Sequence, residues 1–338
     1  MRKLKSQNRT LHRLIENTIF NILRILIIAA VIIFIWSQNN LVLTRNYIYS
    51  SQDLPKSFVG YKILHISDIC NTNNNIISGA KKASPNVIVL SGGYEDANGK
   101  SDRTVRIVNE LCNIAPVYYI YNTNDQTKCL DGTQAINITD SSDLLKPNIT
   151  DVQTFIENVY GKKIINNANK GDEEALQYMQ YISDSLADTS DCSIKICGID
   201  NMNGVLPEDI KQKSYEITGD NSEIKTIMLN GNLANLDSLC ETNIDIMFVG
   251  GTFGKSSETA SCSKGPYSYL ATQLFVSGGC GNYTNKRILN LPEMQLITLS
   301  DGTIKQLNPL ESALDKIIGD VGTIYDNDGG FSEHTYTY

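Results

Sequence analysis

Short apolar runs alternate with helix-like segments along most of this chain, and this alternation limits the fold more than any other feature. Several runs are continuous rather than alternating, as in strands that are covered on both faces. Between the second and third runs, Val105, Val108 and Leu111 recur at helical spacing. Strand and helix in repetition predict a layered α/β fold. The expected strands are Lys62–Ser67, Val87–Ser91, Val117–Tyr121, Ile194–Ile199, Ile224–Leu229, Asp245–Val249, Leu274–Ser277 and Met294–Leu299.

The N-terminal segment is apolar enough to be a membrane anchor. Residues 25–36 are all apolar, and residues 19–23 extend the run apart from Asn21. These 18 residues span about 27 Å as a helix, close to the hydrocarbon thickness of a bilayer. We therefore predict a single-pass transmembrane signal anchor at 19–36. A cleaved signal peptide and a buried soluble helix are the alternatives, although the segment after Trp36 offers no small-x-small cleavage site.

Charge is distributed unevenly along the chain. The first 45 residues carry seven basic side chains against the single acid Glu16, a balance of +6. Because the whole chain carries −8, the remaining residues carry −14. The basic arm at 1–18 predicts a cytoplasmic N-terminus and an extracytoplasmic main domain at the cell membrane. An acidic domain repels nucleic acid, so we expect no nucleic-acid partner.

The rest of the chain divides into three parts. We expect a polar connector at 37–56, one large domain at 57–308 and an acidic, mobile tail at 309–338. Further helices are expected at Asp151–Val159, Glu173–Leu186 and Glu311–Ile318.

Eight cysteines follow the predicted anchor, in the part expected outside the cytoplasm. An even number of thiols in an oxidising compartment allows disulfides, and the sequence leaves their pairing open. Cys192 and Cys197 should not pair with each other if they share a strand, because their odd separation points them to opposite faces. The sequence contains no CxxC pair, which gives a structural zinc site little support.

Four separated segments match the pattern of one family. They are residues 58–68 (FVGYKILHISD), 85–92 (PNVIVLSG), 116–120 (PVYYI) and 274–293. In order and spacing they resemble calcineurin-like metallophosphoesterases of the membrane-anchored bacterial type, over about residues 50–305. The resemblance implies a calcineurin-like four-layer α/β/β/α sandwich whose strand-end loops converge on one cleft. Related anchored enzymes suggest that such a cleft faced phosphodiester or phospholipid-like substrates.

The family's chemistry uses two metal ions, which polarise a phosphate and lower the pKa of a bound water. Aspartate, asparagine and histidine side chains hold these ions, and a further histidine protonates the leaving group. When the family pattern is carried onto this chain, one metal ligand is present and the histidine that acts as general acid is missing. Asp68 is kept; Cys70, Gly93, Thr123, Gly231, Gly251 and Phe253 replace the other ligands, and Asn124 replaces the general-acid histidine.

The histidine count supports the same interpretation. The chain has three histidines, of which His12 lies in the predicted arm and His334 in the tail. His65 lies three residues before Asp68, so their side chains should face opposite sides of the first strand. None of the three can rebuild the site in place.

The remaining polar residues leave two readings open. Asp68 is either a relic that holds backbone amides, or one of three ligands, with Asp96 and Asp125, for a single hard cation such as Ca²⁺ or Mg²⁺.

Cys70 has no histidine to lower its pKa, which favours an inert thiol or a disulfide. Lys255 is interpreted as a solvated lysine, with a phosphate contact as the alternative. The glycines at 92, 93, 250, 251 and 254 indicate tight turns and close backbone approach, with anion binding through backbone amides as the alternative.

We therefore expect a pseudoenzyme that needs no cofactor and acts as a binding or structural protein. Its partners would be the membrane, through the N-terminal helix, and an unknown protein or phosphate-containing ligand. The alternative is a phosphodiester or phosphomonoester hydrolase with a remodelled single-metal site built from oxygens and Cys70.

Overall fold

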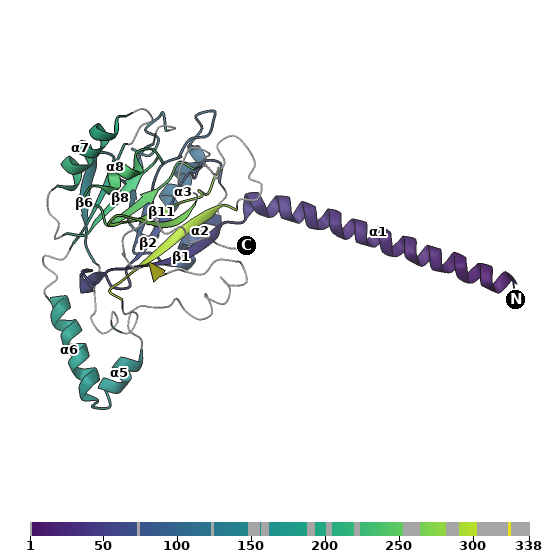
Figure 1. The fold of residues 1–338 in the computed structure, drawn as a ribbon, viewed down its shortest axis with the longest axis horizontal. Coiled ribbons are helices and arrows are strands. Elements are labelled where there is room, and N and C mark those ends of the chain that lie inside the picture. The colour runs from purple at the N-terminus through teal and green to yellow at the C-terminus, as the bar shows by residue number, and fades with distance from the viewer. Residues whose placement is uncertain are drawn as a thin grey trace.

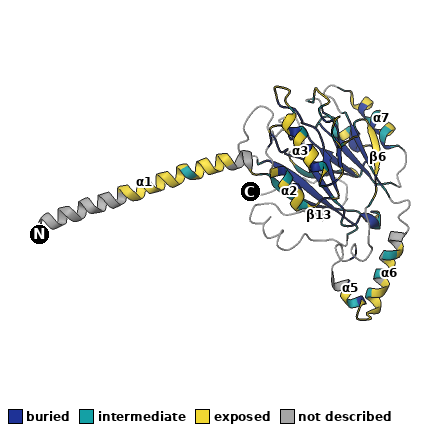
Figure 2. Ribbon diagram, turned by 180° about the vertical axis from the view of Figure 1, so that it is seen from behind, coloured by how far each residue is buried: buried dark blue, intermediate teal, exposed yellow. Residues whose placement is uncertain are grey.

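The structure is a computed structural model that describes residues 2–72, 75–122, 125–147, 156, 162–187, 193–200, 205–219, 224–252, 264–281, 291–302 and 324–325. Within these residues, one helix is long and apolar enough to cross a membrane. This helix, α1 (Arg2–Asn40), contains the apolar span Asn17–Trp36, which agrees with the segment expected from sequence. The span is exposed except at Ala29, which is intermediate, and it extends away from the body of the protein (Figures 1 and 2). Length and composition also suit a signal sequence.

Two mixed β-sheets form the body, as expected for an α/β protein. In order across sheet A, the strands are β13 (Ile324–Tyr325), β1 (Leu43–Ser50), β12 (Glu293–Ser300), β2 (Lys62–Ile66), β3 (Val87–Leu90), β4 (Val117–Tyr119) and β5 (Ile136–Asn137). In order across sheet B, they are β10 (Gly265–Tyr269), β11 (Thr272–Val276), β9 (Ile246–Val249), β8 (Thr226–Asn230), β7 (Ile194–Ile199) and β6 (Ser141–Leu145).

The two sheets pack face to face, and helices cover the outer face of each. Residues such as Ile63 of sheet A and Phe248 of sheet B share one buried cluster between the sheets. Helices α2 (Asn75–Ala83) and α3 (Asp102–Cys112) pack on the other face of sheet A, where Leu111 is buried. Helices α7 (Pro207–Thr218) and α8 (Leu236–Cys240) pack on sheet B in the same way.

Helix α3 illustrates how the sequence produces this layering. Thr104, Ile107, Val108 and Leu111 are buried, and their spacing of three or four residues places them on one side of the helix. That side faces β3 and β4, whose continuous apolar sequences fit burial on both faces.

A helical hairpin projects from the body between β6 and β7. It consists of α5 (Lys162–Ala168) and α6 (Glu173–Ala187), and it agrees with the helix expected at Glu173–Leu186. Helix α6 contacts the short 3₁₀ helix η1 (Lys56–Phe58), which precedes β2. Figure 1 shows the hairpin and α1 leaving the body on different sides.

The strand directions define the end of the molecule at which a site is expected. Strands β2, β3 and β4 run parallel, as do β7, β8 and β9. Their carboxyl ends meet across the two sheets, because Ser67 after β2 donates a hydrogen bond to Ser277 after β11 (2.9 Å). We call the end of the two sheets where β2, β3, β8 and β9 finish the site edge.

Two expectations about the flanking segments were wrong in part. The stretch expected to be a polar connector at 37–56 contains β1, which pairs along its whole length with β12. Tyr47, Ile48 and Tyr49 are buried in this strand, whereas its polar first half is partly buried. Within the tail that we expected to be mobile, Ile324 and Tyr325 pair with β1. The helices expected at Glu311–Ile318 and, apart from Ile156, at Asp151–Val159 lie outside the described residues.

Candidate functional site

Asp68 lies at the centre of the site edge, directly after β2. Its backbone has φ +49°, a left-handed conformation that aspartate tolerates better than most residues. The side chain is fully buried, and its Oδ1 accepts a hydrogen bond from the Gly251 N–H of sheet B (3.2 Å). Its own N–H donates to the carbonyl of Gly92 (2.9 Å). The carboxylate therefore joins the loop after β2 to the loop after β9.

Cys70, where the resemblance calls for a histidine ligand, is also fully buried. Its N–H donates to the Gly93 carbonyl (3.0 Å), and its thiol is not in a disulfide. The carbonyl of Cys70 lies against Gly281, where a Cβ would be 1.8 Å away. The residue thus lies in a closely packed backbone rather than in an open electropositive setting of the kind that activates a thiol.

Three glycines stand where the resemblance calls for metal ligands, and the space around each is already filled. A Cβ on Gly93 would lie 2.5 Å from the Asp68 Cα. A Cβ on Gly231 would lie 2.5 Å from the Asn122 Cβ, and one on Gly251 would lie 2.3 Å from the Gly231 carbonyl oxygen. Gly93 and Gly251 also have positive φ, at +80° and +78°. These positions therefore lack both a ligand and the room for one.

Asp125 holds the loops after β3 and β4 together. Its Oδ2 accepts hydrogen bonds from the N–H groups of Gly93 (3.1 Å) and Asn122 (3.0 Å), and its Oδ1 accepts from Tyr94 (2.6 Å). Burial of the carboxylate raises its pKa to about 6, while the three N–H donors act in the opposite direction. Both oxygens are thus engaged by backbone amides.

Asp96 has a similar role nearer the surface. Its Oδ1 accepts from the N–H groups of Asn98 (2.8 Å) and Lys100 (2.9 Å), which closes the turn after β3. The Lys100 N–H bond, and then the Asn98 N–H and Asn71 side-chain bonds, hold the pKa of Asp96 below its usual value. Among the residues that the structure describes, no three His, Cys, Asp or Glu side chains are grouped in a way that could hold a metal ion.

His65 belongs to the core between the sheets. Its Nε2 is 2.7 Å from the Ser91 Oγ and its Nδ1 is 3.0 Å from the Gln295 Oε1. Its ring centre lies 5.0 Å from that of Phe248 in sheet B. Burial lowers the pKa of His65 to about 4, so the ring is neutral at neutral pH. This hydrogen-bonded chain is fully buried, and so it has no open path to a substrate.

The structure brings five of the expected site positions together and leaves three undescribed. Asp68, Cys70, Gly93, Gly231 and Gly251 lie in the direct contacts given above. Thr123, Asn124 and Phe253 lie outside the described residues, as do Lys255, Gly254 and Cys192. Sequence reasoning missed the His65–Ser91–Gln295 chain. The alternation of Ile63 and His65 within a strand could have placed the histidine on the inner face, but Gln295 is 230 residues away.

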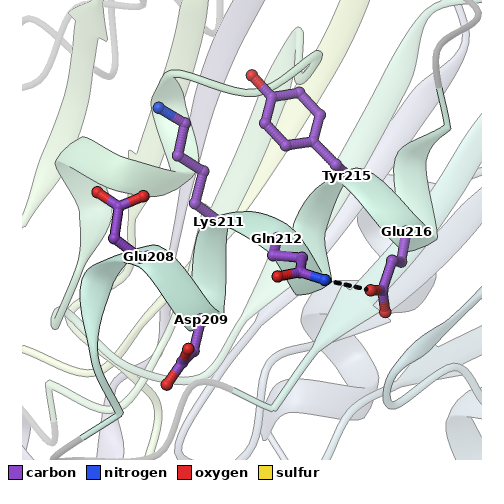
Figure 3. Close-up of a pocket in the computed structure, with 6 residues that line it drawn as sticks. All are labelled: Glu208, Asp209, Lys211, Gln212, Tyr215 and Glu216. Atoms are coloured by element: carbon purple, nitrogen blue, oxygen red, sulfur yellow. Dashed lines mark hydrogen bonds between the residues drawn. The ribbon is translucent and has the colours of Figure 1, made fainter.

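A shallow surface pocket lies elsewhere, on the solvent side of α7 (Figure 3). All of its lining residues come from this single helix, so no polar groups from separate elements converge there. Its lining residues are Glu208, Asp209, Lys211, Gln212, Tyr215 and Glu216. In comparisons with known proteins, no family model matches the chain and no curated protein matches its sequence.

Proposed function

We propose that this protein is a membrane-anchored relative of the calcineurin-like metallophosphoesterases whose two-metal site has closed. It acts as an extracytoplasmic binding or structural protein rather than as a hydrolase. The observation that carries this proposal is the packing at Gly93, Gly231 and Gly251. At each of these expected ligand positions, a neighbouring atom occupies the place of a side chain.

The layered arrangement of the sheets supports the family assignment. Two mixed sheets with helices on both outer faces fit a calcineurin-like four-layer α/β/β/α sandwich. The expected order of loops is also kept, because Asp68, Gly93, Gly231 and Gly251 meet at one edge. A fold alone does not determine function, so the chemistry of the edge has to decide between an enzyme and a binding protein.

The chemistry of the edge favours a binding protein. Two-metal hydrolysis needs several oxygen and nitrogen ligands that converge on ions a few ångströms apart. Asp68, Asp96 and Asp125 each accept hydrogen bonds from backbone amides instead. A single divalent cation would have to share these carboxylates with the backbone amides that already donate to them.

The anchor gives the proposed location. Helix α1 would cross the cell membrane once through Asn17–Trp36, with the basic arm in the cytoplasm and the two-sheet body outside. The ligand would be an unidentified protein or a phosphate-containing molecule.

Metal content and phosphodiesterase activity of the full chain in detergent test the proposal. The protein is offered Mn²⁺, Fe²⁺ and Zn²⁺ with bis-p-nitrophenyl phosphate as substrate, and Asp68→Asn is the matched variant. We expect metal far below one ion per chain and no turnover in either protein. Near-stoichiometric metal with turnover that Asp68→Asn abolishes would instead establish the alternative, a hydrolase with a remodelled single-metal site.

A further inference from the structure

The anchor helix joins the body of the protein almost without a spacer. Helix α1 continues four residues past the apolar span to Asn40, and β1 begins at Leu43. From Trp36 to Leu43 the chain covers at most about 16 Å. Strand β1 is paired with β12 over all of its residues, from Leu43 opposite Glu293 to Ser50 opposite Ser300. The body therefore begins immediately outside any bilayer that α1 crosses.

The direction of β1 determines which end of the body faces that bilayer. Strand β1 is parallel to β12, and β12 is antiparallel to β2, with Gln295 opposite His65. The same register places Glu293 beside Ser67. Because Leu43, the first residue of β1, pairs with Glu293, the chain enters sheet A at the level of Ser67, the residue before Asp68. The Arg45 Nε to Glu293 Oε2 ion pair, at 2.5 Å, fixes this corner. The entry point is at the site edge.

The α5–α6 hairpin lies at the opposite end of the sheets. It connects the carboxyl end of β6 to the amino end of β7, and these two strands are antiparallel. Helix α6 contacts η1, which precedes the amino end of β2. Both views of the molecule place the hairpin apart from the junction with α1 (Figures 1 and 2).

We propose that the site edge faces the lipid headgroups of the membrane that α1 crosses, and that the α5–α6 hairpin points away from it. This inference rests on α1 being a membrane anchor. Parts of the loops that follow β3 and β4 at this edge are exposed, and they present Lys100 and Lys128 to lipid phosphates. The short connection, rather than the net charge of the acidic body, holds the edge at the surface. A ligand of the site edge must then come from the headgroup layer.

Two matched probe positions test this orientation in the full chain. Lys128 is placed near the site edge by its neighbour Thr127, whose N–H donates to Glu95 Oε1 in the loop after β3 (2.7 Å). Lys170 lies in the turn between α5 and α6, and both lysines are exposed. A fluorescent amino acid replaces one or the other, and each variant is reconstituted into phosphatidylcholine vesicles with a fraction of nitroxide-headgroup lipid. We expect several-fold stronger quenching at 128 than at 170. Equal quenching, or stronger quenching at 170, would overturn the inference.

A spacer variant and a sedimentation control separate the orientation from the anchor itself. A flexible Gly/Ser spacer between Asn40 and Leu41 should reduce the quenching at 128 towards that at 170. A preference for 128 that survives the spacer would exclude the short connection as its cause. Carbonate-resistant sedimentation with the vesicles reports on the anchor alone. Loss of sedimentation refutes the anchor, whereas sedimentation without a quenching preference refutes only the orientation.

Discussion

The two sheets contribute to the site edge in opposite ways. On the sheet A side, the loops keep carboxylates, and Asp68, Asp96 and Asp125 each hold backbone N–H groups. On the sheet B side, a Cβ on Gly231 would meet the Asn122 side chain of the loop after β4, and a Cβ on Gly251 would meet the Gly231 carbonyl. The sheet A side uses its charge to hold loops together, and the sheet B side has no room for a side chain at these two glycines.

Under the proposed function, this difference means that losing a metal site involves more than exchanging ligands. A carboxylate that accepts two or three N–H bonds stabilises the loop it closes, and it then resists removal for structural reasons. A glycine permits close approach, so neighbouring atoms can occupy the volume that a side chain would need. The two changes reinforce each other, because Asp68 binds the N–H of Gly251 across the gap.

The largest effect is expected from a histidine at Gly251 on the sheet B side, where the resemblance calls for a metal ligand. Gly251→His should lower the free energy of unfolding by more than about 3 kcal/mol, because its Cβ would meet the Gly231 carbonyl at 2.3 Å. Gly99→His is the matched control, since Gly99 also has positive φ (+71°) but no atom lies within 4 Å of its Cβ. It should cost about 1–2 kcal/mol of backbone strain.

Urea unfolding of the full chain in detergent measures both variants, followed by the near-ultraviolet circular dichroism of the tyrosines. Trp36 is a poor reporter here because it lies in α1. If Gly251→His is no more destabilising than Gly99→His, the sheet B side has room for a ligand and the closed-site proposal fails.

The second effect tests the sheet A side. Asp125→Asn should lower the free energy of unfolding by about 2–3 kcal/mol, because an amide presents one oxygen and one NH₂ group to three backbone N–H donors. Asp53→Asn is the control, since the Asp53 side chain is 87% exposed and its contact with Lys225 is 3.9 Å long. Asp53→Asn should change the free energy of unfolding by no more than about 0.5 kcal/mol. Equal costs in the same urea experiment would mean that Asp125 does not hold the loops.

Sequence patterns were sufficient to predict the strands of the core. They were not sufficient to predict the contacts that fill the site edge. Each expected strand is present to within a few residues, because continuous apolar runs such as that of β3 require burial on both faces. Strand β1 was missed because Thr44, Arg45 and Asn46 look like a connector until Glu293 is known to pair with Arg45.

The meeting of the strand-end loops was expected from the family resemblance, and Asp68, Gly93, Gly231 and Gly251 do meet at one edge. The sequence did not predict the contacts that fill the site, because those contacts depend on the distance between the two sheets. Glycine spacing indicated tight turns, and Gly92, Gly93 and Gly251 have the positive φ that such turns use. Nothing in a single sequence reveals that Gly231 lies against Asn122.

The pH dependence of stability compares the core with the loops. The pKa of His65 is lowered to about 4, so the folded state binds fewer protons than the unfolded state, and stability falls as pH drops from about 6.5 to 4. The pKa of Asp125 is raised to about 6, so its contribution is present below about 4 and is lost as pH rises through 6. The two effects oppose each other between pH 4 and 6.

Variants at these two positions should separate the opposing contributions. Relative to the wild type, Asp125→Asn should lose stability more steeply on acidification from pH 6 to 4, by up to about 1.4 kcal/mol per pH unit. His65→Gln should lose it less steeply over the same range. Urea unfolding at several pH values gives both slopes. Identical slopes in all three proteins would show that neither group titrates differently in the folded state.

The smallest effect is expected at Asp96, which lies nearer the surface than Asp68 and Asp125. A residual cation site was the alternative interpretation of this residue. Asp96→Asn should cost only about 0.5 kcal/mol, because an asparagine oxygen can still accept from the N–H groups of Asn98 and Lys100. Millimolar Ca²⁺ or Mg²⁺ should leave the thermal midpoint of both proteins unchanged, since the carboxylates of Asp68 and Asp125 already hold backbone amides. A cation that stabilises the wild type but not Asp96→Asn would show instead that the sheet A side still binds metal. In that case the proposed closure would apply to the sheet B side alone.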